Sequence, residues 1–597
     1  MFFLRIFGCR LYYRYAGNRI STLLSKYDIA SRVRFTRDSD DISYRKNEFG
    51  IEQDLLVFAK SFLKPILKVD LSKYFLNIKS LEEKLRITCI AHMSSGYHTI
   101  GAPISYFESY HPDITQLYIY HGGVKSFMFR AHGINTNFSI KHRYIPTFTG
   151  VLCHFKQNLK KLINYLNYLF LWRREFKEKS QIGDLKISPE KVENKFAVVF
   201  YKSTYFGDLY EKNYFFSSDA KNPLYKDNVA KYIVSPDSKS KRTDLIELSI
   251  GRFDFLKSLN IKLMFELIFK NLPKISFFSI LYIVYLQAKY SAWLRIVSGI
   301  KEEKIIADYD ILFPKELLLA FETRGKTTYS FQDRVETSYT YIAGAFYDYY
   351  FASSKFFANA CSNNFMYCCG KIIPYAFIRL IGFNNEEACT ISQLKLSPSN
   401  HAPVDSFKHV VSIFDWAYDV DDNSNSLSVI MNDHSFDNRM NEIMLMAIKN
   451  PNIAFILRYK YIPSAINNKL RVLTNSCRNI FICDDYSIQY ASYILIESSD
   501  VIIGSPSSVL TDALAYGKQV IIYDYFYTCS NVASAHYPSD FDFCIVKNPI
   551  ELQSLLQKVI NKDELILEEY EHLRLLISGD SSSNMKTTPS QMLLDNS

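Results

Sequence analysis

The sequence predicts an α/β fold class with two domains that face a cleft, preceded by an additional mixed N-terminal region. The chain of 597 residues is too long to build around a single core. Its 48% apolar and 22% charged residues are typical of a folded globular protein. Short apolar runs also alternate with amphipathic segments, as they do in proteins built from strands and helices in turn.

The last part of the chain has the clearest pattern. Segments between its apolar runs are amphipathic, such as "FDNRMNEIMLMAIKN", in which Met440, Ile443 and Met444 share one helical face. Apolar strands separated by helices predict a parallel sheet covered on both sides, so residues 400–577 are expected to form a Rossmann-like domain. The candidate strands are "HVVSIF" (409–414), "IAFIL" (453–457), "NIFIC" (479–483), "VII" (501–503) and "QVIIY" (519–523).

A noisier version of this pattern predicts a second Rossmann-like domain over residues 195–390. Helical material that includes residues 275–288 lies between its first two candidate strands. A stretch rich in Ser, Pro and Asn, residues 392–406, connects the two halves, and two α/β domains joined in this way imply a cleft. The candidate strands are "FAVVFY" (196–201), "YDILF" (309–313), "TTYSF" (327–331), "YYFAS" (349–353) and "FMYCCG" (365–370).

Residues 1–190 give weaker signals. The segment "LYIYHGG" (117–123) predicts one strand followed by a glycine turn. The segment "KQNLKKLINYLNYLFLWRREFKEK" (156–179) predicts a basic amphipathic helix, which either covers the core of this region or lies on an anionic membrane. At the other end of the chain, the polar tail of residues 578–597 is expected to be disordered.

Charge, cysteine spacing and hydropathy narrow the classes of function. A net charge of +9 suits anionic partners such as nucleotides, while no compact block of Lys and Arg indicates nucleic acid. The 11 Cys residues lack disulfide-like or zinc-like spacing, which predicts reduced thiols in a cytoplasmic protein. The apolar N-terminus is interrupted by Arg5, Arg10 and Arg14, so it lacks a signal-peptide core and secretion is not expected. The uncharged run 275–288 is shorter than the roughly 20 residues that cross a bilayer, so it predicts a buried helix or an interfacial segment and no transmembrane span.

The stretch "DVIIGSPSSVLTDALAYGKQVIIYD", residues 500–524, gives the strongest indication of chemistry. An apolar strand runs into a serine-rich turn, in which Ser505, Ser507 and Ser508 precede a helix whose backbone N–H groups their hydroxyls can cap. A helix N-terminus at the carboxyl end of a strand favours a phosphate oxygen, and Asp524 closes the next strand beside it. This combination suggests a nucleotide-sugar diphosphate, and the alternative is an ordinary helix cap.

The same stretch resembles the C-terminal donor-site signature of GT-B glycosyltransferases of the surface-carbohydrate and capsule type, which are related to teichoic-acid glycerophosphotransferases that use CDP-glycerol. In that signature an aspartate, a strand, paired serines, an "E-A-L-x-x-G-K" helix and a second strand follow in order. The glutamate of the helix is Asp512 here, and "IAFILRYK" resembles the family strand that ends in a lysine, here Lys460. The resemblance is clear over residues 405–565 and faint over 310–385. It implies that the donor is held by Lys460, Ser505, Ser507, Ser508, Asp512 and Asp524.

The catalytic residues are less clear from the sequence. The resemblance implies a base in the first α/β domain, but the histidine expected there in teichoic-acid polymerases has no obvious counterpart. Gln332 and Asp333 occupy that neighbourhood and are the catalytic candidates, although an ion pair with Arg334 would also explain Asp333. His121 in "YHGG" is a further candidate base, with a structural role as its alternative.

Two D-x-D tripeptides, residues 308–310 and 540–542, match the pattern by which another class of transferases holds a divalent metal. Such tripeptides are common by chance, and Asp308 would precede the candidate strand 309–313 instead of following it. The GT-B resemblance implies an enzyme without such a metal. No metal site is therefore predicted, and no cofactor is expected besides the nucleotide-activated substrate.

These observations predict a cytoplasmic, metal-independent glycosyltransferase, or a glycerophosphate-type transferase, that builds a surface carbohydrate. Its expected partners are a nucleotide sugar and a glycan or lipid-linked acceptor. A possible further partner is an anionic membrane, contacted peripherally at the inner face of the plasma membrane. Two alternatives are a nucleotide-sugar 2-epimerase of the same fold and a non-catalytic scaffold for carbohydrate assembly.

Overall fold

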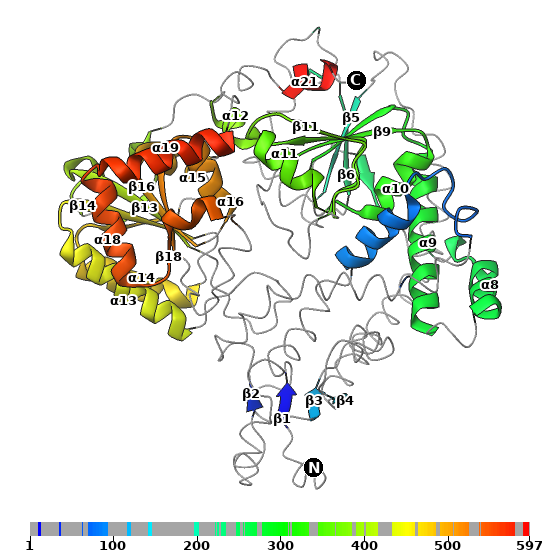
Figure 1. Ribbon diagram of the computed structural model, residues 1–597, viewed down its shortest axis with the longest axis horizontal. Coiled ribbons are helices and arrows are strands. Elements are labelled where there is room, and N and C mark those ends of the chain that lie inside the picture. Colours follow the sequence, from blue (N-terminus) through cyan, green and yellow to red (C-terminus); the bar gives the residue numbers. More distant parts are fainter. Residues whose placement is uncertain are drawn as a thin grey trace, which may run out of the picture. The chain divides into compact units, whose positions relative to one another are not determined.

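The computed structural model contains three β-sheets, two of them large and flanked by helices (Figure 1). Statements about the structure concern the residues that it describes. These are mainly 70–92, 196–201, 229–234, 246–250, 257–271, 277–308, 313–332, 344–364, 366–384, 390–398, 401–415, 433–459, 464–484, 490–505, 507–523, 539–578 and 589–595, with short segments and single residues elsewhere.

The chain divides into two compact units. One unit comprises residues 1–66, 96–193 and 271–281, and the other comprises residues 67–95, 194–270 and 282–597. The first unit contains a small parallel sheet in the order β2-β1-β3-β4. Its strands are β1 (Arg10–Tyr13), β2 (Phe35–Thr36), β3 (Gln116–Tyr120) and β4 (Lys141–Ile145), and β3 confirms the strand predicted in "LYIYHGG". The predicted basic helix 156–179 and His121 lie outside the described residues.

The first large sheet belongs to the second unit and is parallel throughout. Its strands lie in the order β11-β10-β9-β8-β5-β6-β7. The strand of this sheet that comes first in the sequence, β5, therefore lies inside the sheet, between β8 and β6. The strands are β5 (Phe196–Phe200), β6 (Ala230–Val234), β7 (Ile246–Leu248), β8 (Lys304–Ala307), β9 (Thr327–Phe331), β10 (Tyr349–Ala352) and β11 (Lys371–Pro374).

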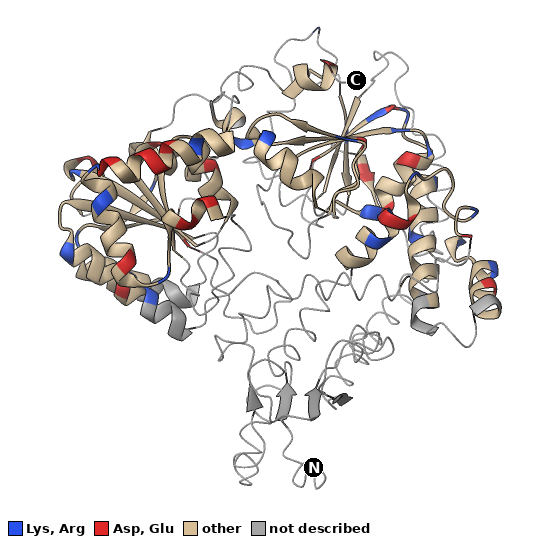
Figure 2. Cartoon of the chain, viewed as in Figure 1, with Lys and Arg blue, Asp and Glu red and all other residues tan. Residues whose placement is uncertain are grey.

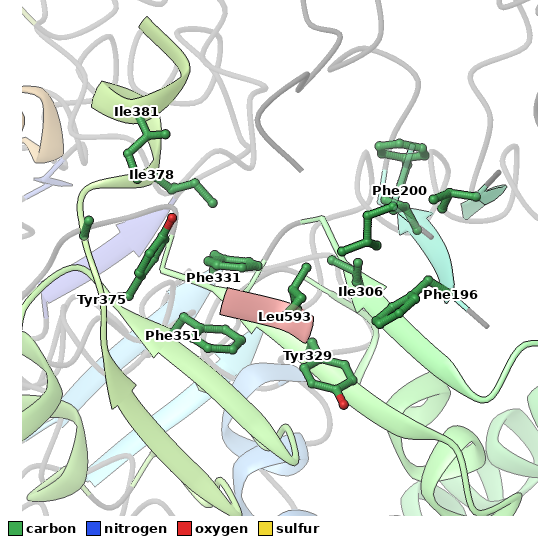
Figure 3. Packing of buried hydrophobic residues seen from close by; sticks show 14 of the residues in the cluster. Phe196, Phe200, Ile306, Tyr329, Phe331, Phe351, Tyr375, Ile378, Ile381 and Leu593 are labelled. Carbon is green, nitrogen blue, oxygen red and sulfur yellow. The ribbon is translucent and has the colours of Figure 1, made fainter. Parts of the chain in front are cut away.

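Buried aromatic and aliphatic side chains hold this sheet to the elements that cover it (Figure 3). The rings of Phe331 and Phe351, on neighbouring strands, stack with centroids 4.6 Å apart, and Tyr375 meets both rings edge-on. Such pairs add to the free energy gained by burial alone. The helices of this domain are α8 (Ile261–Asn271), α9 (Phe277–Val297), α10 (Lys315–Thr323), α11 (Lys355–Ser362) and α12 (Ile378–Asn384).

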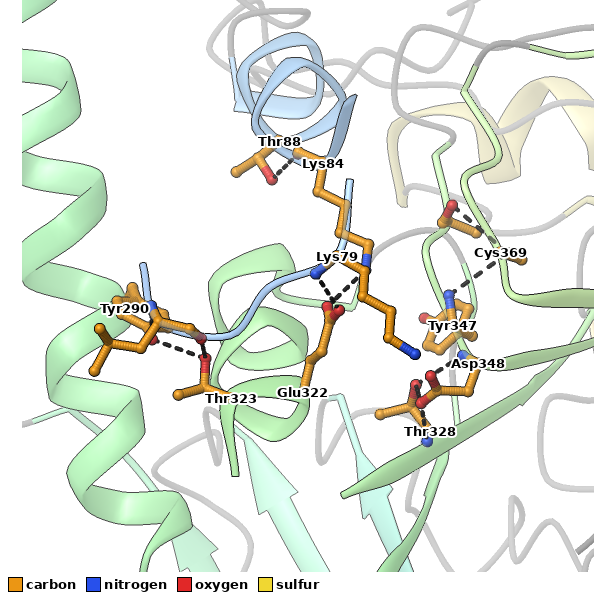
Figure 4. Close-up of polar contacts among 12 residues, drawn as sticks. Lys79, Lys84, Thr88, Tyr290, Glu322, Thr323, Thr328, Tyr347, Asp348 and Cys369 are labelled. Atoms are coloured by element: carbon orange, nitrogen blue, oxygen red, sulfur yellow. Dashed lines mark hydrogen bonds and ion pairs between the residues drawn. The ribbon is translucent and has the colours of Figure 1, made fainter. Parts of the chain in front are cut away.

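Residues 70–92 pack onto helix α10, although the sequence analysis grouped them with the N-terminal region (Figure 4). On α10, Glu322 accepts hydrogen bonds from Lys84 Nζ at 2.6 Å and from the Lys79 backbone N–H at 2.8 Å. The hydroxyl of Thr323 donates to the Leu76 carbonyl oxygen at 2.8 Å. These polar contacts attach the segment to the first Rossmann-like domain.

The second large sheet has the order β12-β15-β14-β13-β16-β17-β18, in which only β12 is antiparallel to its neighbour among the described strands. Its strands are β12 (Leu396–Ser397), β13 (His409–Asp415), β14 (Ile453–Tyr459), β15 (Ile480–Cys483), β16 (Val501–Gly504), β17 (Gln519–Tyr523) and β18 (Ile545–Val546). Its helices are α13 (Asp433–Lys449), α14 (Ser464–Ser476), α15 (Ala491–Ser498), α16 (Ser508–Ala515), α18 (Pro549–Ile560) and α19 (Glu564–Ser578).

Both large sheets follow the strand order of the doubly wound fold. Numbered from β5 in one sheet and from β13, the first parallel strand, in the other, the order is 3-2-1-4-5-6, extended by β11 and by β12 respectively. The α/β fold class and the two Rossmann-like domains are thereby confirmed. In such sheets the direction of winding reverses beside the first strand, which here places one switch point between β5 and β8 and the other between β13 and β16.

Two predicted strands of the first domain are wrong. The fourth strand is Lys304–Ala307, and Asp310 and Phe313, the described residues of the predicted strand 309–313, lie outside any strand. The last strand is Lys371–Pro374 instead of residues 365–370. Both true strands are only four residues long and begin with a lysine, so the longer apolar runs beside them gave the stronger signal.

The prediction of a disordered tail is also wrong for residues 589–595, which form helix α21 (Pro589–Asp595). Proline is favoured in the first turn of a helix, and the apolar residues Met592, Leu593 and Leu594 follow it. Leu593 is 0% exposed and belongs to the core cluster of the first large sheet (Figure 3). This burial offsets the conformational entropy lost on ordering a short polar segment.

Among the described helices, none combines the length and the apolar character that a membrane-spanning segment needs. Helix α9 covers the uncharged run 275–288 of the sequence from Phe277 onward, and several of its side chains are buried within the domain. The prediction of a helix in this part of the chain is confirmed, and the buried side chains agree with the buried helix and not with the interfacial segment.

Candidate functional site

The polar groups of the candidate site lie at the switch point of the second sheet. Strands β13 and β16 pair in parallel with Phe414 opposite Gly504, so Asp415 and Ser505 follow side by side at the carboxyl ends. A Cβ atom on Gly504 would lie 2.6 Å from the Phe414 carbonyl oxygen and 3.0 Å from a methyl carbon of Leu510. Only glycine therefore lets the two strand ends approach this closely.

Asp415 connects the two strand ends to helix α13. Its Oδ1 accepts a hydrogen bond from the Ser505 hydroxyl at 3.3 Å, and its Oδ2 accepts one from Arg439 Nε at 3.2 Å. Arg439 is 0% exposed, and Ser505 is also buried. A buried carboxylate is stabilised by such donors, and a buried guanidinium by such an acceptor.

The far side of the Arg439 guanidinium contacts the end of β17. Its central carbon lies 4.4 Å from the ring centre of Tyr523, and Nη1 lies 3.6 Å from Oε2 of Glu442. The Tyr523 hydroxyl donates to the same Glu442 oxygen at 2.9 Å. Burial raises the pKa of Glu442, although the Arg439 charge opposes this rise. For Arg439, burial acts to lower the pKa, and the Asp415 charge contributes most to raising it above its usual value.

The serine-rich turn leads directly into helix α16, whose first residue is Ser508. Ser507 occupies the N-cap position, but its hydroxyl makes no capping hydrogen bond, contrary to the prediction from the sequence. The backbone of Ser507 is fixed instead by Tyr537, whose hydroxyl receives the Ser507 N–H at 3.2 Å and donates to the Ser507 carbonyl at 2.9 Å. The helix thus begins with its N-cap hydroxyl unused for capping.

Asp512 lies in the same helix but points into the domain. Its Oδ2 accepts a hydrogen bond from the Tyr493 hydroxyl at 2.7 Å, and the residue is 2% exposed. The ring of Phe383 on α12 packs against Tyr493 and Tyr516. This placement suits a role in holding α16 in position more than direct contact with a ligand.

Two other donor-site candidates lie outside the described residues. Lys460 directly follows Tyr459, the last residue of β14, and Asp524 directly follows Tyr523, the last residue of β17. Asp415, Arg439 and Tyr523 are not among the residues predicted from the sequence. Asp415 could have been found, because it closes an apolar run of the sequence just as Asp524 does. Arg439 has no such signal, since a charged residue in an amphipathic helix normally indicates a solvated face.

Polar residues also follow three neighbouring strands of the first sheet. Asp308 follows β8, Gln332 follows β9 and Ser353 follows β10. Gln332 is 2% exposed, and its Oε1 accepts the Ser353 backbone N–H at 2.9 Å. Its side chain therefore connects two strand ends, and the adjacent Asp333 lies outside the described residues.

Asp308 belongs to the first D-x-D tripeptide, for which the sequence predicts no metal-binding role. Because β8 ends at Ala307, Asp308 follows the strand and lies at the switch point of the first sheet, with its backbone N–H donating to the Val199 carbonyl of β5. It is 2% exposed. Asp310, the other aspartate of this tripeptide, is hydrogen-bonded to two tyrosines. Its Oδ2 accepts a hydrogen bond from the Tyr350 hydroxyl at 2.7 Å, and its carbonyl oxygen accepts one from the Tyr347 hydroxyl at 2.6 Å.

The described residues show no group of three or more His, Cys, Asp or Glu side chains arranged to hold a metal ion. Asp540 and Asp542, in the second D-x-D tripeptide, lie in a short 3-10 helix and are exposed. Figure 2 shows basic and acidic residues interspersed along the helices that flank both large sheets.

The chain matches no family model and no curated protein sequence. Solved structures do match it. A UDP-GlcNAc 2-epimerase from Neisseria meningitidis bound to UDP-GlcNAc is 12% identical and covers 67% of this chain and 99% of its own, with a TM-score of 0.37. A structure of the wall teichoic acid polymerase TagF is 14% identical and covers 74% of this chain and 97% of its own, with a TM-score of 0.36. A mutant O-GlcNAc transferase from Thermobaculum terrenum is 12% identical and covers 69% of each chain, with a TM-score of 0.30. The site is therefore interpreted from its own residues.

Proposed function

We propose that the protein is a glycosyltransferase, or a glycerophosphate-type transferase, whose donor is activated by a nucleoside diphosphate. The observation that supports this most is the hydrogen bond between Ser505 and Asp415 across the switch point, directly before a helix with an unused N-cap hydroxyl at Ser507. Switch points are where doubly wound domains bind nucleotides, and helix N-termini bind phosphate.

The donor diphosphate would lie against the first turn of α16. Backbone N–H groups of that turn and the hydroxyls of Ser507 and Ser508 would donate to its oxygens, with Lys460 supplying a positive charge and Asp524 accepting from ribose or sugar hydroxyls. As the bond to the diphosphate oxygen breaks, negative charge develops on the leaving group, and these donors stabilise it. No step requires a metal ion.

The acceptor hydroxyl needs a base, and we place it in the first domain. Asp308, at the switch point of that sheet, would take the proton while the acceptor oxygen forms a bond to the donor's reacting atom. In sugar transfer the bond between the sugar carbon and the diphosphate oxygen breaks and a nucleoside diphosphate leaves, whereas in glycerophosphate transfer the bond between the two phosphates breaks and a nucleoside monophosphate leaves. Asp333 is the second candidate, because it follows Gln332 at the carboxyl end of β9. Residues of the first domain would thus activate the acceptor, which we propose to be a glycan or a lipid-linked precursor of a surface carbohydrate at the inner face of the plasma membrane.

Calorimetric titration of the full-length protein with UDP, CDP, GDP and ADP tests this proposal. At least one of these nucleotides should bind, and changing Ser507 and Ser508 together to Ala should weaken its binding by about tenfold to a hundredfold for each charge-assisted hydrogen bond lost. The melting temperature should change little, because the Ser507 hydroxyl makes no capping bond. Wild-type affinity in the double variant, or no binding of any of the four nucleotides, would contradict the proposal.

Product analysis then separates transfer from the alternatives. A transferase releases its nucleotide product, a nucleoside diphosphate after sugar transfer or a nucleoside monophosphate after glycerophosphate transfer, only when an acceptor is present. A 2-epimerase converts the donor without an acceptor, and a scaffold binds the donor without turnover. The matching sugar-linked form of the nucleotide that binds in the titration is the donor for this assay.

A further inference from the structure

We infer that Arg439 is a positioning residue that fixes the serine-rich turn of the donor site through Asp415 and Ser505. This inference rests on the proposed function, because it assigns a role within the same site. The path has two hydrogen bonds, from Arg439 Nε to Asp415 Oδ2 at 3.2 Å and from the Ser505 hydroxyl to Asp415 Oδ1 at 3.3 Å. Both carboxylate oxygens of Asp415 are used, so its orientation is set from two sides.

The orientation of Arg439 is itself determined by its surroundings. Its guanidinium lies over the Tyr523 ring and beside Glu442, and Tyr523 and Glu442 are hydrogen-bonded to each other. Tyr523 is the last residue of β17, and Asp524 follows it directly. Arg439 therefore contacts the end of β17 directly and the start of the serine-rich turn through Asp415.

The charge of Arg439 has a second consequence for an anionic donor. Asp415 lies at the switch point, where its negative charge would repel a diphosphate in surroundings of low dielectric. The adjacent guanidinium compensates this charge. Buried ion pairs contribute little net stability compared with well-packed apolar residues, so a requirement for stability alone explains this arrangement poorly.

The test compares nucleotide affinity with thermal stability in the full-length protein, using the nucleoside diphosphate of the four that binds the wild type. Changing Arg439 to Met, or Ser505 to Ala, should each raise its dissociation constant about tenfold, the effect of losing one charge-assisted hydrogen bond. Because both changes break the same path of hydrogen bonds, the double variant should bind the nucleotide about as weakly as the single variant with the higher dissociation constant. Arg439→Lys keeps the charge and should give a dissociation constant between those of the wild type and Arg439→Met. If Arg439→Met does not fold, Arg439→Lys tests the positioning role in its place.

Asn479→Ala is the matched control. The Asn479 side chain is buried in the same domain at the start of β15, and its Nδ2 donates to the carbonyls of Ala447, Asn450 and Ile453. This variant should melt at a lower temperature and bind the nucleotide as the wild type does. Two results would overturn the positioning role alone. In the first, the Arg439 variants also melt at a lower temperature but keep the wild-type dissociation constant. In the second, the effects of Arg439→Met and Ser505→Ala on the dissociation constant simply add. A wild type that binds none of the four nucleotides would overturn the proposed function and this inference with it.

Discussion

Single residues at strand ends determine what each domain can do. At the second switch point, Gly504 permits the close approach of β16 to β13, and Asp415 and Ser505 use it to form their hydrogen bond. At the first switch point, Asp308 places a buried carboxylate beside the end of β5. The proposed phosphate-binding turn in one domain and the buried carboxylate in the other are the two kinds of group that transfer to a hydroxyl requires.

The role of Asp308 can be tested separately from donor binding. Changing Asp308 to Asn keeps its shape and removes the base, so kcat should fall by about a hundredfold to ten thousandfold. The dissociation constant for the nucleotide should stay unchanged, because the proposed donor site belongs to the other domain. Asp540→Asn, in the exposed D-x-D tripeptide, is the control and should leave both quantities unchanged. An Asp308→Asn variant with wild-type kcat would assign the proton to another group, with Asp333 tested next.

At the scale of helices and strands, a buried ionic cluster joins three helical segments of the first domain. Glu316 on α10 lies 3.1 Å from Lys289 Nζ on α9 and 3.3 Å from Nε2 of His92 in the helical segment 81–92. Burial acts to raise the pKa of Glu316, but His92 and Lys289 outweigh burial and lower it below its ordinary value of 4.5. The charged form of Glu316 is therefore favoured in the folded state.

This shift predicts how stability depends on pH. A carboxylate whose pKa is lowered by folding stabilises the protein fully above its unfolded pKa of 4.5, and this contribution is lost as the pH falls below that value. Glu316→Gln should lower the free energy of unfolding by about 1.5–3 kcal/mol at pH 7, the range for hydrogen bonds to charged groups. The difference between wild type and variant should shrink steadily below pH 4.5. Denaturant unfolding at several pH values measures it, and a difference that stays constant down to pH 3 would contradict the assignment.

The sequence predicted those elements whose local signal agrees with their final environment. All five strands predicted for the second domain are present, because each is a short run made up mainly of apolar residues, and the serine-rich turn is recognisable because it lies between two of them. Strand β8 was missed, and Asp308 with it, because "KIIA" is shorter than the apolar segment after it. Arg439 could not be predicted, since only the packing of α13 against the ends of β13 and β17 makes it a buried residue.

At the scale of the whole molecule, the end of the chain returns to the first Rossmann-like domain. Helix α19 belongs to the second domain, where the hydroxyl of Tyr570 donates to the Val520 carbonyl at 2.7 Å. Helix α21 follows it in the sequence and buries Leu593 in the core of the first large sheet. The last residues of the chain are thus part of a core that begins with β5.

This packing predicts a large effect for a residue close to the C-terminus. Changing Leu593 to Ala should lower the free energy of unfolding of the first domain by about 2–5 kcal/mol, as for other buried leucines. Gln591→Ala, on the exposed side of the same helix, is the control and should stay within about 0.5 kcal/mol of wild type. Thermal unfolding of the two variants measures both effects. Equal melting temperatures would show that α21 does not pack on this core in solution.

The central claim is that a nucleoside diphosphate binds at the switch point of the second domain, against the first turn of α16. Amide hydrogen exchange of the full-length protein, with and without the nucleotide that binds in calorimetry, tests this claim most directly. Exchange should slow in peptides that cover residues 504–512 and the end of β13 at Asp415, while peptides of β6 and β7 in the other domain exchange at an unchanged rate. A bound nucleotide that protects other segments and leaves residues 504–512 unchanged would contradict it.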